Sequence, residues 1–157
     1  MGYLFNMLYF LLMNIFVGTD HRGFELKNKL MEYLQEKNIR IEDMGNYQYD
    51  PLDDYSDFSR KVAQAILQNP QEFLGIVICG SGIGASITVN RFKGIRCALV
   101  FEPEQAKHGR ENDHTNVISL PADYIDLEKA KKIIDAFLEA IPKKEDKYLR
   151  RIRKLDE

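Results

Sequence analysis

Short apolar runs alternate along the chain with longer segments in which apolar residues recur at helical spacing. The run at 74–79 (LGIVIC) is continuously apolar, which is typical of a central parallel strand that is covered on both faces. Four other short segments have the character of strands, at 14–19, 40–44, 95–101 and 115–120. The pattern therefore predicts five strands.

The segments between these runs predict helices. After the first strand, Leu26, Leu30, Tyr33 and Leu34 recur at spacings of three and four, so they share one helical face. Further helices are expected after Asp54, after the glycine-rich turn at 80–84, from 103 to about 111, over 126–141 and over 143–155. This alternation predicts an α/β fold: a single doubly wound, Rossmann-like, five-stranded parallel sheet with helices on both faces and a C-terminal helix.

Parallel sheets bind ligands beyond the carboxyl ends of their strands, which directs attention to particular segments. Asp20 and His21 follow the first strand, a loop at 46–55 follows the second, and Glu102 follows the fourth. The glycine-rich segment at 79–84 follows the third strand, and we add residues 112–114, which lead into the fifth. We expect the functional residues in these five places.

Composition narrows the class of protein. The chain has 157 residues, of which 45% are hydrophobic and 29% charged, as in one globular domain rather than a disordered chain. The net charge of −2 gives no reason to expect nucleic acid as a partner. A basic run near the end is interpreted first as a solvated helix face, with a nucleic-acid patch or a site for one small anion as the alternatives; it contains Arg150, Arg151, Arg153 and Lys154.

The N-terminal segment and the cysteines bear on location. Residues 8–17 form an apolar run too short to span a bilayer as a helix, and no Lys or Arg precedes it. We interpret residues 1–13 as an apolar extension of a domain at 14–157, either from an upstream start or as an extra apolar strand; a membrane anchor is the other alternative. Cys79 and Cys97 lie in apolar runs without the spacing of a metal site, which favours a reduced, cytoplasmic protein.

The loop after the third strand is suited to an anion. It runs through Cys79, Gly80, Ser81, Gly82, Ile83 and Gly84 directly into a helix. Glycines allow a ligand to approach the backbone closely, and the helix start offers unpaired N–H groups and the positive end of the helix dipole. A tight turn without a ligand is the alternative interpretation.

Two chemistries fit such a loop. Gly80, Gly82 and Ala85 fit the dinucleotide fingerprint G-x-G-x-x-A, with Glu102 as the acid for the ribose, although that fingerprint normally lies in the first strand–helix unit. Alternatively, the helix start favours the thiolate of Cys79, which could remove a proton from carbon beside a carbonyl. Ser81 and the loop N–H groups would then stabilise the enediolate. Cys79 as a small buried apolar residue is the third interpretation.

Several motifs together resemble the B-type ribose-5-phosphate isomerase family, which includes the galactose-6-phosphate isomerase subunits. The segment at 19–27 (TDHRGFELK) resembles the opening motif of that family, and Asp54 and Tyr55 resemble its Asp-Tyr pair. The segment ICGSGIG at 78–84 resembles its catalytic loop, with Ser81 in place of the usual Thr. The segments at 90–96, 115–117 and 150–152 also fall in register, so the resemblance covers about residues 14–155.

The resemblance implies interconversion of an aldose and a ketose phosphate through a cis-enediolate, without a metal or cofactor. Cys79 would be the base, and Ser81 with the amides of Gly82 and Gly84 would hold the enediolate. Asp20 and Tyr55 would bind sugar hydroxyls, and His21 and Arg151 the phosphate. Such proteins are homodimers or homotetramers whose active sites are shared between subunits. The expected substrate is ribose 5-phosphate, and neither nucleic acid nor a membrane is an expected partner. The other substrate-binding positions implied are Gly80, Ile83, Asn112, Asp113 and Lys147.

The chain differs from the family pattern in one region. The ring-opening histidine of the family falls on Asn112, and the family reads His-Asn-Asp where this chain has Asn112, Asp113 and His114. Residues two apart in extended chain point to the same side, so His114 is a candidate replacement; a surface histidine is the alternative. An arginine after the fifth strand becomes Asp123 and a terminal Arg-His pair becomes Lys147-Tyr148.

Asp123 beside a phosphate would be repulsive, so it points away, the ligand lies differently, or the sugar is another one. Two functions therefore stand beside the isomerase. One is a divergent, non-catalytic or partner-dependent subunit that binds a sugar phosphate. The other is a dinucleotide-binding module.

Overall fold

The computed structural model describes residues 14–157. The predicted N-terminal extension at 1–13 lies outside the described residues. Within residues 14–157 no helix is both long enough and apolar enough to cross a membrane.

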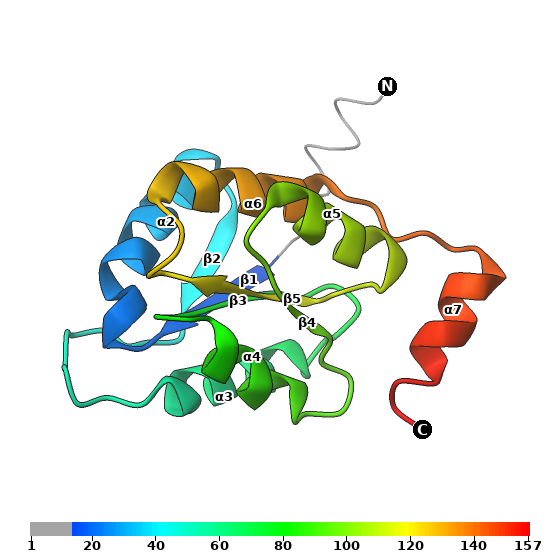
Figure 1. The fold of residues 1–157 in the computed structure, drawn as a ribbon, viewed down its shortest axis with the longest axis horizontal. Coiled ribbons are helices and arrows are strands. Elements are labelled where there is room, and N and C mark those ends of the chain that lie inside the picture. Colours follow the sequence, from blue (N-terminus) through cyan, green and yellow to red (C-terminus); the bar gives the residue numbers. More distant parts are fainter. Residues whose placement is uncertain (1–13) are drawn as a thin grey trace.

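Five parallel strands form one sheet in the order β2-β1-β3-β5-β4, which confirms the predicted fold class (Figure 1). The strands are β1 (Asn14–Thr19), β2 (Arg40–Asp43), β3 (Leu74–Cys79), β4 (Cys97–Leu99) and β5 (Val117–Pro121). The central strand β3 is buried along its whole length, as its apolar sequence predicts.

Strand β4 is shorter than the predicted 95–101. Side chains take the backbone hydrogen bonds at both of its ends. Asn116 Oδ1 accepts from the N–H of Arg96 at 2.8 Å, and Gln105 Oε1 accepts from the N–H of Phe101 at 2.9 Å. Gln105 Oε1 also accepts from the N–H of Glu102 at 3.1 Å, as part of the capping box of the following helix, and the start of this helix therefore ends the strand early.

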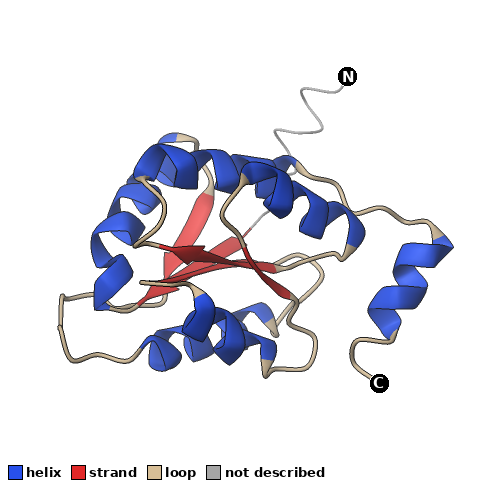
Figure 2. Cartoon of the chain, viewed as in Figure 1, coloured by secondary structure: helices blue, strands red, loops and turns tan. Residues whose placement is uncertain are grey.

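Helices cover both faces of the sheet (Figure 2). A short 3-10 turn η1 (His21–Gly23) leads into α2 (Phe24–Glu36), which lies on the same face as α5 (Pro103–Asn112) and α6 (Leu127–Glu139). On the other face lie α3 (Tyr55–Ile66) and α4 (Ile83–Asn90). The last helix, α7 (Asp146–Arg153), stands beside this body and has no buried side chain.

Alternate side chains of β3 enter two separate apolar clusters. Ile76 and Ile78 pack with residues of α2 and α6, including Phe137, whereas Val77 and Cys79 pack with residues of α3 and α4. Cys79 therefore lies on the α3–α4 face of the sheet, at the end of the strand that leads into α4.

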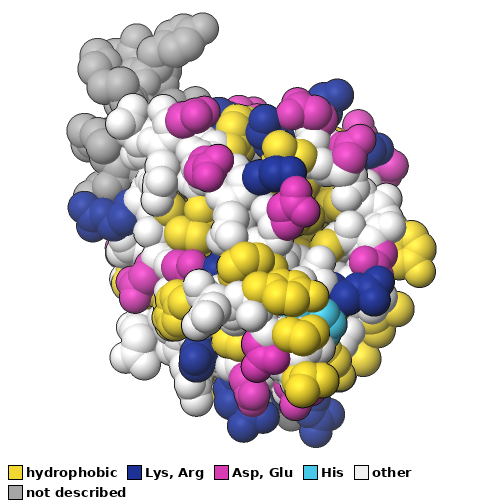
Figure 3. Space-filling model, turned by 90° about the vertical axis from the view of Figure 1, so that its left-hand side faces the viewer, with side chains coloured by type: hydrophobic (Ala, Val, Ile, Leu, Met, Phe, Trp, Pro, Cys, Tyr) yellow, Lys and Arg dark blue, Asp and Glu magenta, His cyan; other side chains and the backbone are white. Residues whose placement is uncertain are grey.

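The sheet order brings the ends of β1, β3 and β5 side by side, because these strands are neighbours. The loops after β1, β2 and β3 lie on the left of Figure 1, and this side faces the viewer in Figure 3. There, hydrophobic side chains lie among charged side chains of both signs. This edge is where parallel sheets bind their ligands.

Candidate active site

The glycine-rich loop is fixed by the backbone conformation of Gly82 and by contacts from β5. Gly82 precedes α4 with a φ of +71°, which favours glycine, and a Cβ there would lie 2.5 Å from Leu99 Cδ1. Ser119 Oγ, fully buried on β5, donates to the Gly82 carbonyl at 2.6 Å. The loop is thus held in one shape before any ligand binds.

Cys79 lies at the start of this turn and Ser81 lies in its middle. Cys79 is the last residue of β3, only 3% exposed, and its carbonyl accepts from the N–H of Ala122 at 3.0 Å. Ser81 Oγ accepts from the N–H of Ile83 at 3.2 Å, so its own hydrogen is left to donate to a ligand. The first turn of α4 adds the N–H groups that make a helix start a site for negative charge.

The second cysteine has a different environment. Burial raises the pKa of the Cys97 thiol to about 12, so at neutral pH it stays protonated. Cys97 is therefore no candidate for a base, and Cys79 is the thiol to consider at the carboxyl edge.

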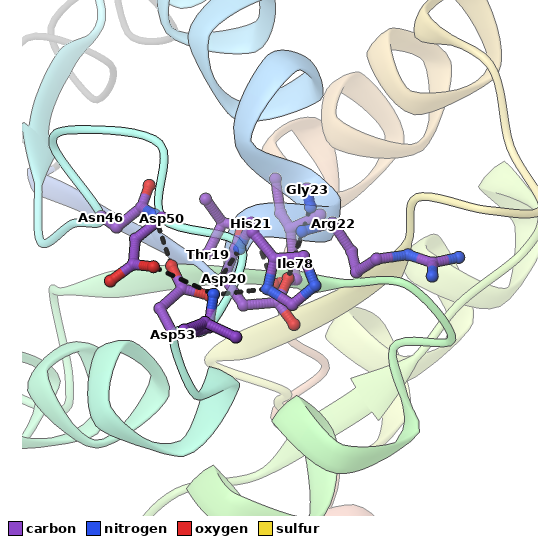
Figure 4. A network of polar contacts seen from close by, with 10 residues as sticks. Thr19, Asp20, His21, Arg22, Gly23, Asn46, Asp50, Asp53 and Ile78 are labelled. Carbon is purple, nitrogen blue, oxygen red and sulfur yellow. Dashed lines mark hydrogen bonds and ion pairs between the residues drawn. The ribbon is translucent and has the colours of Figure 1, made fainter.

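Asp20 organises the turn that follows β1. Its carboxylate accepts from the N–H groups of Arg22 at 3.0 Å and Gly23 at 3.3 Å, as the cap of η1 (Figure 4). Burial raises the pKa of this carboxyl above its ordinary value, although the two backbone contacts oppose that shift. Asp20 therefore presents a nearly buried acid, 4% exposed, beside the loop edge.

His21 is clamped by Asp53, a residue that the sequence did not single out. Asp53 Oδ1 accepts from the backbone N–H of His21 and contacts the ring Nδ1, both at 2.8 Å. A carboxylate only accepts, so Nδ1 carries the hydrogen. The pKa of His21 is raised, first by this hydrogen bond and then by the charges of Asp20 and Asp53. Burial and Arg22 oppose the rise.

Tyr55 reaches the glycine loop from the start of α3. A Cβ on Gly84 would lie 2.5 Å from Tyr55 Cζ, so the tyrosine ring lies directly over this glycine. The Tyr55 side chain remains partly open, with 42% of the residue exposed. A ligand on the loop would thus have the Tyr55 ring at its side.

Asp123 is paired with a cation. Its carboxylate forms an ion pair with Arg22, which comes from the other side of β3. The pair passes beside Gly80, where a Cβ would lie 2.6 Å from Asp123 Oδ2 and 3.2 Å from Arg22 Nε. Asp123 therefore lies at the loop, but Arg22 neutralises its charge.

The residues at 112–114 lie at the amino end of β5, away from the glycine loop. The expectation of an extended segment is wrong: Asn112 is the last residue of α5, and His114 has a φ of +50°. Their side chains bind the chain before α7. His114 Nε2 contacts the Lys143 carbonyl at 2.7 Å, and Asn112 Oδ1 accepts from Lys143 Nζ at 2.9 Å. Asp113 is exposed beside them.

The predicted residues of α7 are also far from the loop. Lys147 and Arg151 are both exposed and lie four residues apart, on one face of the helix. Figure 1 shows α7 on the opposite side of the molecule from the loops after β1, β2 and β3. One chain therefore assembles nine of the predicted residues at the carboxyl edge: Asp20, His21, Tyr55, Cys79, Gly80, Ser81, Gly82, Ile83 and Gly84. Five lie elsewhere: Asn112, Asp113, His114, Lys147 and Arg151.

Glu102 does not fit the dinucleotide interpretation. It caps α5 together with Gln105 and forms an ion pair with Lys129. Strand β4, which precedes it, is separated from β3 by β5, so Glu102 does not follow the strand next to the fingerprint loop. Within residues 14–157 no cluster of three or more His, Cys, Asp or Glu side chains could hold a metal ion.

Sequence reasoning missed Asp53 and Arg22 as members of this edge. Arg22 stands inside the quoted opening motif and Asp53 immediately before the Asp-Tyr pair. Their positions within or next to these motifs were the only indication in the sequence that the two residues belong to the site. Their partners lie 32 and 101 residues away in the chain, so no local pattern reveals the contacts.

Known proteins of similar sequence share this architecture. The family model described as Ribose/Galactose Isomerase matches residues 15–155. A probable ribose-5-phosphate isomerase B of Mycoplasma pneumoniae is 39% identical over 126 residues, covering 80% of this chain and 82% of the relative. The ribose-5-phosphate isomerase B of Escherichia coli is 37% identical over 123 residues, covering 78% and 81%.

Solved structures agree. Ribose-5-phosphate isomerase B of Mycoplasma genitalium, crystallised with bound ribulose-5-phosphate, superposes with a TM-score of 0.88 at 36% identity, covering 91% of this chain and 93% of that one. The Thermotoga maritima protein of the same name gives 0.85 at 42% identity, covering 91% and 97%. On the family match and these identities, the chain belongs to the ribose/galactose isomerase family.

Proposed function

We propose that this protein interconverts ribose 5-phosphate and ribulose 5-phosphate. The observation that carries the proposal is Cys79 at the mouth of a preformed anion loop, with Tyr55 and His21 beside it. Relatives named ribose-5-phosphate isomerase B, one of them solved with ribulose-5-phosphate, support the choice of sugar.

In this reaction Cys79, as thiolate, removes the proton from C2 of the open-chain aldose. The electron pair forms the C1–C2 double bond, and charge moves to O1, where Ser81 and the amides of Gly82 and Gly84 stabilise it. The proton on O2 passes to O1, and Cys79 returns its proton to C1, which leaves the ketone at C2. The step is an internal transfer of hydrogen and needs no oxidant or reductant.

The other residues of the edge bind the substrate. Asp20 and Tyr55 hold sugar hydroxyls, and His21 contacts the phosphate. Gly80 and Ile83 line the loop. Arg22 keeps the carboxylate of Asp123 from repelling the substrate, which answers the difficulty that the sequence raised.

A second copy of the chain completes the site. This inference is supported by the distance of Lys147 and Arg151 from Cys79 within one chain and by the lack of buried residues on α7. Ile83 and Ile87 on α4 are 52% and 59% exposed, which leaves apolar surface for a partner subunit beside the loop. In the homodimer, Arg151 and Lys147 of one subunit bind the phosphate held by the other. His114 opens the sugar ring there, with Asn112 and Asp113 beside the substrate.

Both cysteines are free, as in a protein of the reducing cytoplasm.

The test is turnover of ribose 5-phosphate and other aldose and ketose phosphates in deuterated water, followed by NMR. Deuterium at C1 of the product ketose or C2 of the aldose is the expected result, because the proton on Cys79 exchanges with solvent. Binding without any exchange would instead support the divergent binding subunit. That second function has one structural argument: Asn112 and His114 are both engaged by Lys143. Heat on mixing with NAD, and none with sugar phosphates, would restore the dinucleotide interpretation.

A further inference from the structure

His21 is held at two points by one carboxylate oxygen. Asp53 Oδ1 takes both the backbone N–H and the ring Nδ1 of His21, each at 2.8 Å. The side chain of Asp53 is 7% exposed and that of His21 is 26% exposed. Both the position of the backbone and the rotation of the ring are therefore set by Asp53, and within residues 14–157 no group bonds Nε2.

Asp53 is itself held by a chain of contacts from the protein interior. Its second oxygen accepts from Asn46 Nδ2 (Figure 4). The backbone carbonyl of Asn46 accepts from Lys27 Nζ at 2.7 Å, and the fully buried Lys27 also binds Asp43 at 2.6 Å. Polar contacts thus connect Lys27, Asn46, Asp53 and His21 in series. Lys27 joins α2 to the loop after β2, and the two contacts of Asp53 with His21 join that loop to η1.

The charges around His21 favour its protonated form. Asp53 and Asp20 face it as acids and Arg22 as the opposing cation, and the hydrogen bond to Asp53 is the largest cause that raises the pKa of His21. A raised pKa means that the positive charge is present at lower pH and is lost as pH rises through that pKa. A neutral imidazole with its hydrogen on Nδ1 would offer only a lone pair at Nε2, which repels a phosphate oxygen.

We propose that Asp53 is a positioning residue that keeps His21 in its imidazolium form and leaves its Nε2–H to donate to the phosphate of the substrate. The inference rests on the proposed function for the identity of the ligand, but the protonation state of His21 is independent of turnover. Asp53 touches no substrate in this scheme; it acts through His21.

The first measurement is an NMR titration of the imidazole nitrogens. The chain has three histidines, so His21→Gln identifies the resonances of His21 by their loss. In the unaltered protein Nδ1 and Nε2 of His21 should both stay protonated to higher pH than in Asp53→Asn. The matched control is Asp54→Asn, because Asp54 is adjacent but its side chain makes no capping hydrogen bond. An identical titration of His21 in Asp53→Asn and the unaltered protein would overturn the proposal.

The second measurement uses sulfate, a dianion whose own charge is constant over the working pH range. We expect its affinity for the unaltered protein to fall about tenfold as His21 loses its proton, the worth of one charge-assisted hydrogen bond. In Asp53→Asn the fall should come at lower pH. If Asp53→Asn fails to fold, Asp53→Glu takes its place, and the sulfate measurement on the unaltered protein still tests the role given to His21. Sulfate affinity that ignores the titration of His21 would overturn the proposal.

The two proposals fail separately. A protein that isomerises no sugar phosphate, yet shows the Asp53-dependent titration and the matching loss of sulfate affinity, would refute the isomerase and keep this inference. A protein that isomerises ribose 5-phosphate, while the His21 titration is unchanged in Asp53→Asn, would do the reverse. For an active enzyme, Asp53→Asn should raise KM more than it lowers kcat.

Discussion

Replacing the buried Lys27 with methionine tests the polar anchor of the loop after β2. Lys27→Met keeps the length of the side chain but leaves Asp43 Oδ2 and the Asn46 backbone carbonyl without their donor, while Asp43 Oδ1 still accepts from the N–H of Gly45. Breaking a buried ion pair in this way costs about 3–5 kcal/mol. The Asp43 side chain is 25% exposed and regains some water, so we expect about 3 kcal/mol of lost stability. Adding Asp43→Asn to Lys27→Met removes the unpaired charge, so the double variant should recover about 1 kcal/mol of the lost stability.

The assay is urea unfolding at pH 7 followed by circular dichroism, with the free energy extrapolated to water. Lys29→Met is the matched control on the same helix, because Lys29 forms an exposed i,i+4 pair with Glu25. Such pairs contribute about 0.3–0.5 kcal/mol. Equal small losses in the two variants would show that the Lys27 contacts contribute little, and the reasoning from burial would be wrong.

Three further substitutions test the carboxyl edge. Cys79→Ser should abolish most turnover while sugar-phosphate binding and the melting temperature persist, whereas Cys97→Ser should keep turnover; near-normal activity of Cys79→Ser would remove the thiol base. Gly84→Ala should push the Tyr55 ring aside and raise KM several-fold, with little change in melting temperature because the ring is partly exposed and can move. An unchanged KM would show that Tyr55 does not contact the substrate. Arg22→Ala should raise KM several-fold by leaving Asp123 unpaired beside the loop, and Arg22→Ala with Asp123→Ala should recover most of the affinity. Equal KM values in the single and double variants would refute the role given to the pair.

The fold was accessible from the sequence because its elements are specified locally. The run at 74–79 is apolar throughout, and it forms the fully buried β3. The helix expected after Asp54 begins at Tyr55, and the one expected near Pro103 begins there. The strand order was beyond such patterns, since it depends on how the crossovers pack. The ends of β4 were set by Asn116 and Gln105, whose side chains reach backbone groups outside the strand pattern.

The site was accessible only in part. Residues that follow a strand directly, such as Cys79 and His21, can be placed at one edge from the order of elements alone. Contacts across the sheet cannot: Asp53 reaches His21 and Asp123 reaches Arg22 from distant parts of the chain. The turn at His114 was misjudged because α5 continues to Asn112 and His114 then adopts a left-handed conformation, which is uncommon for residues other than glycine.

The remote position of α7 has a genetic consequence under the proposed function. If each site takes its thiol from one subunit and its phosphate-binding cations from the other, a chain lacking Cys79 and a chain lacking Lys147 and Arg151 would each be inactive alone. Mixed in one dimer, the two lesions would fall together in one site and spare the other completely. Two defective alleles would then complement each other, because one of the two sites in each mixed dimer would work normally.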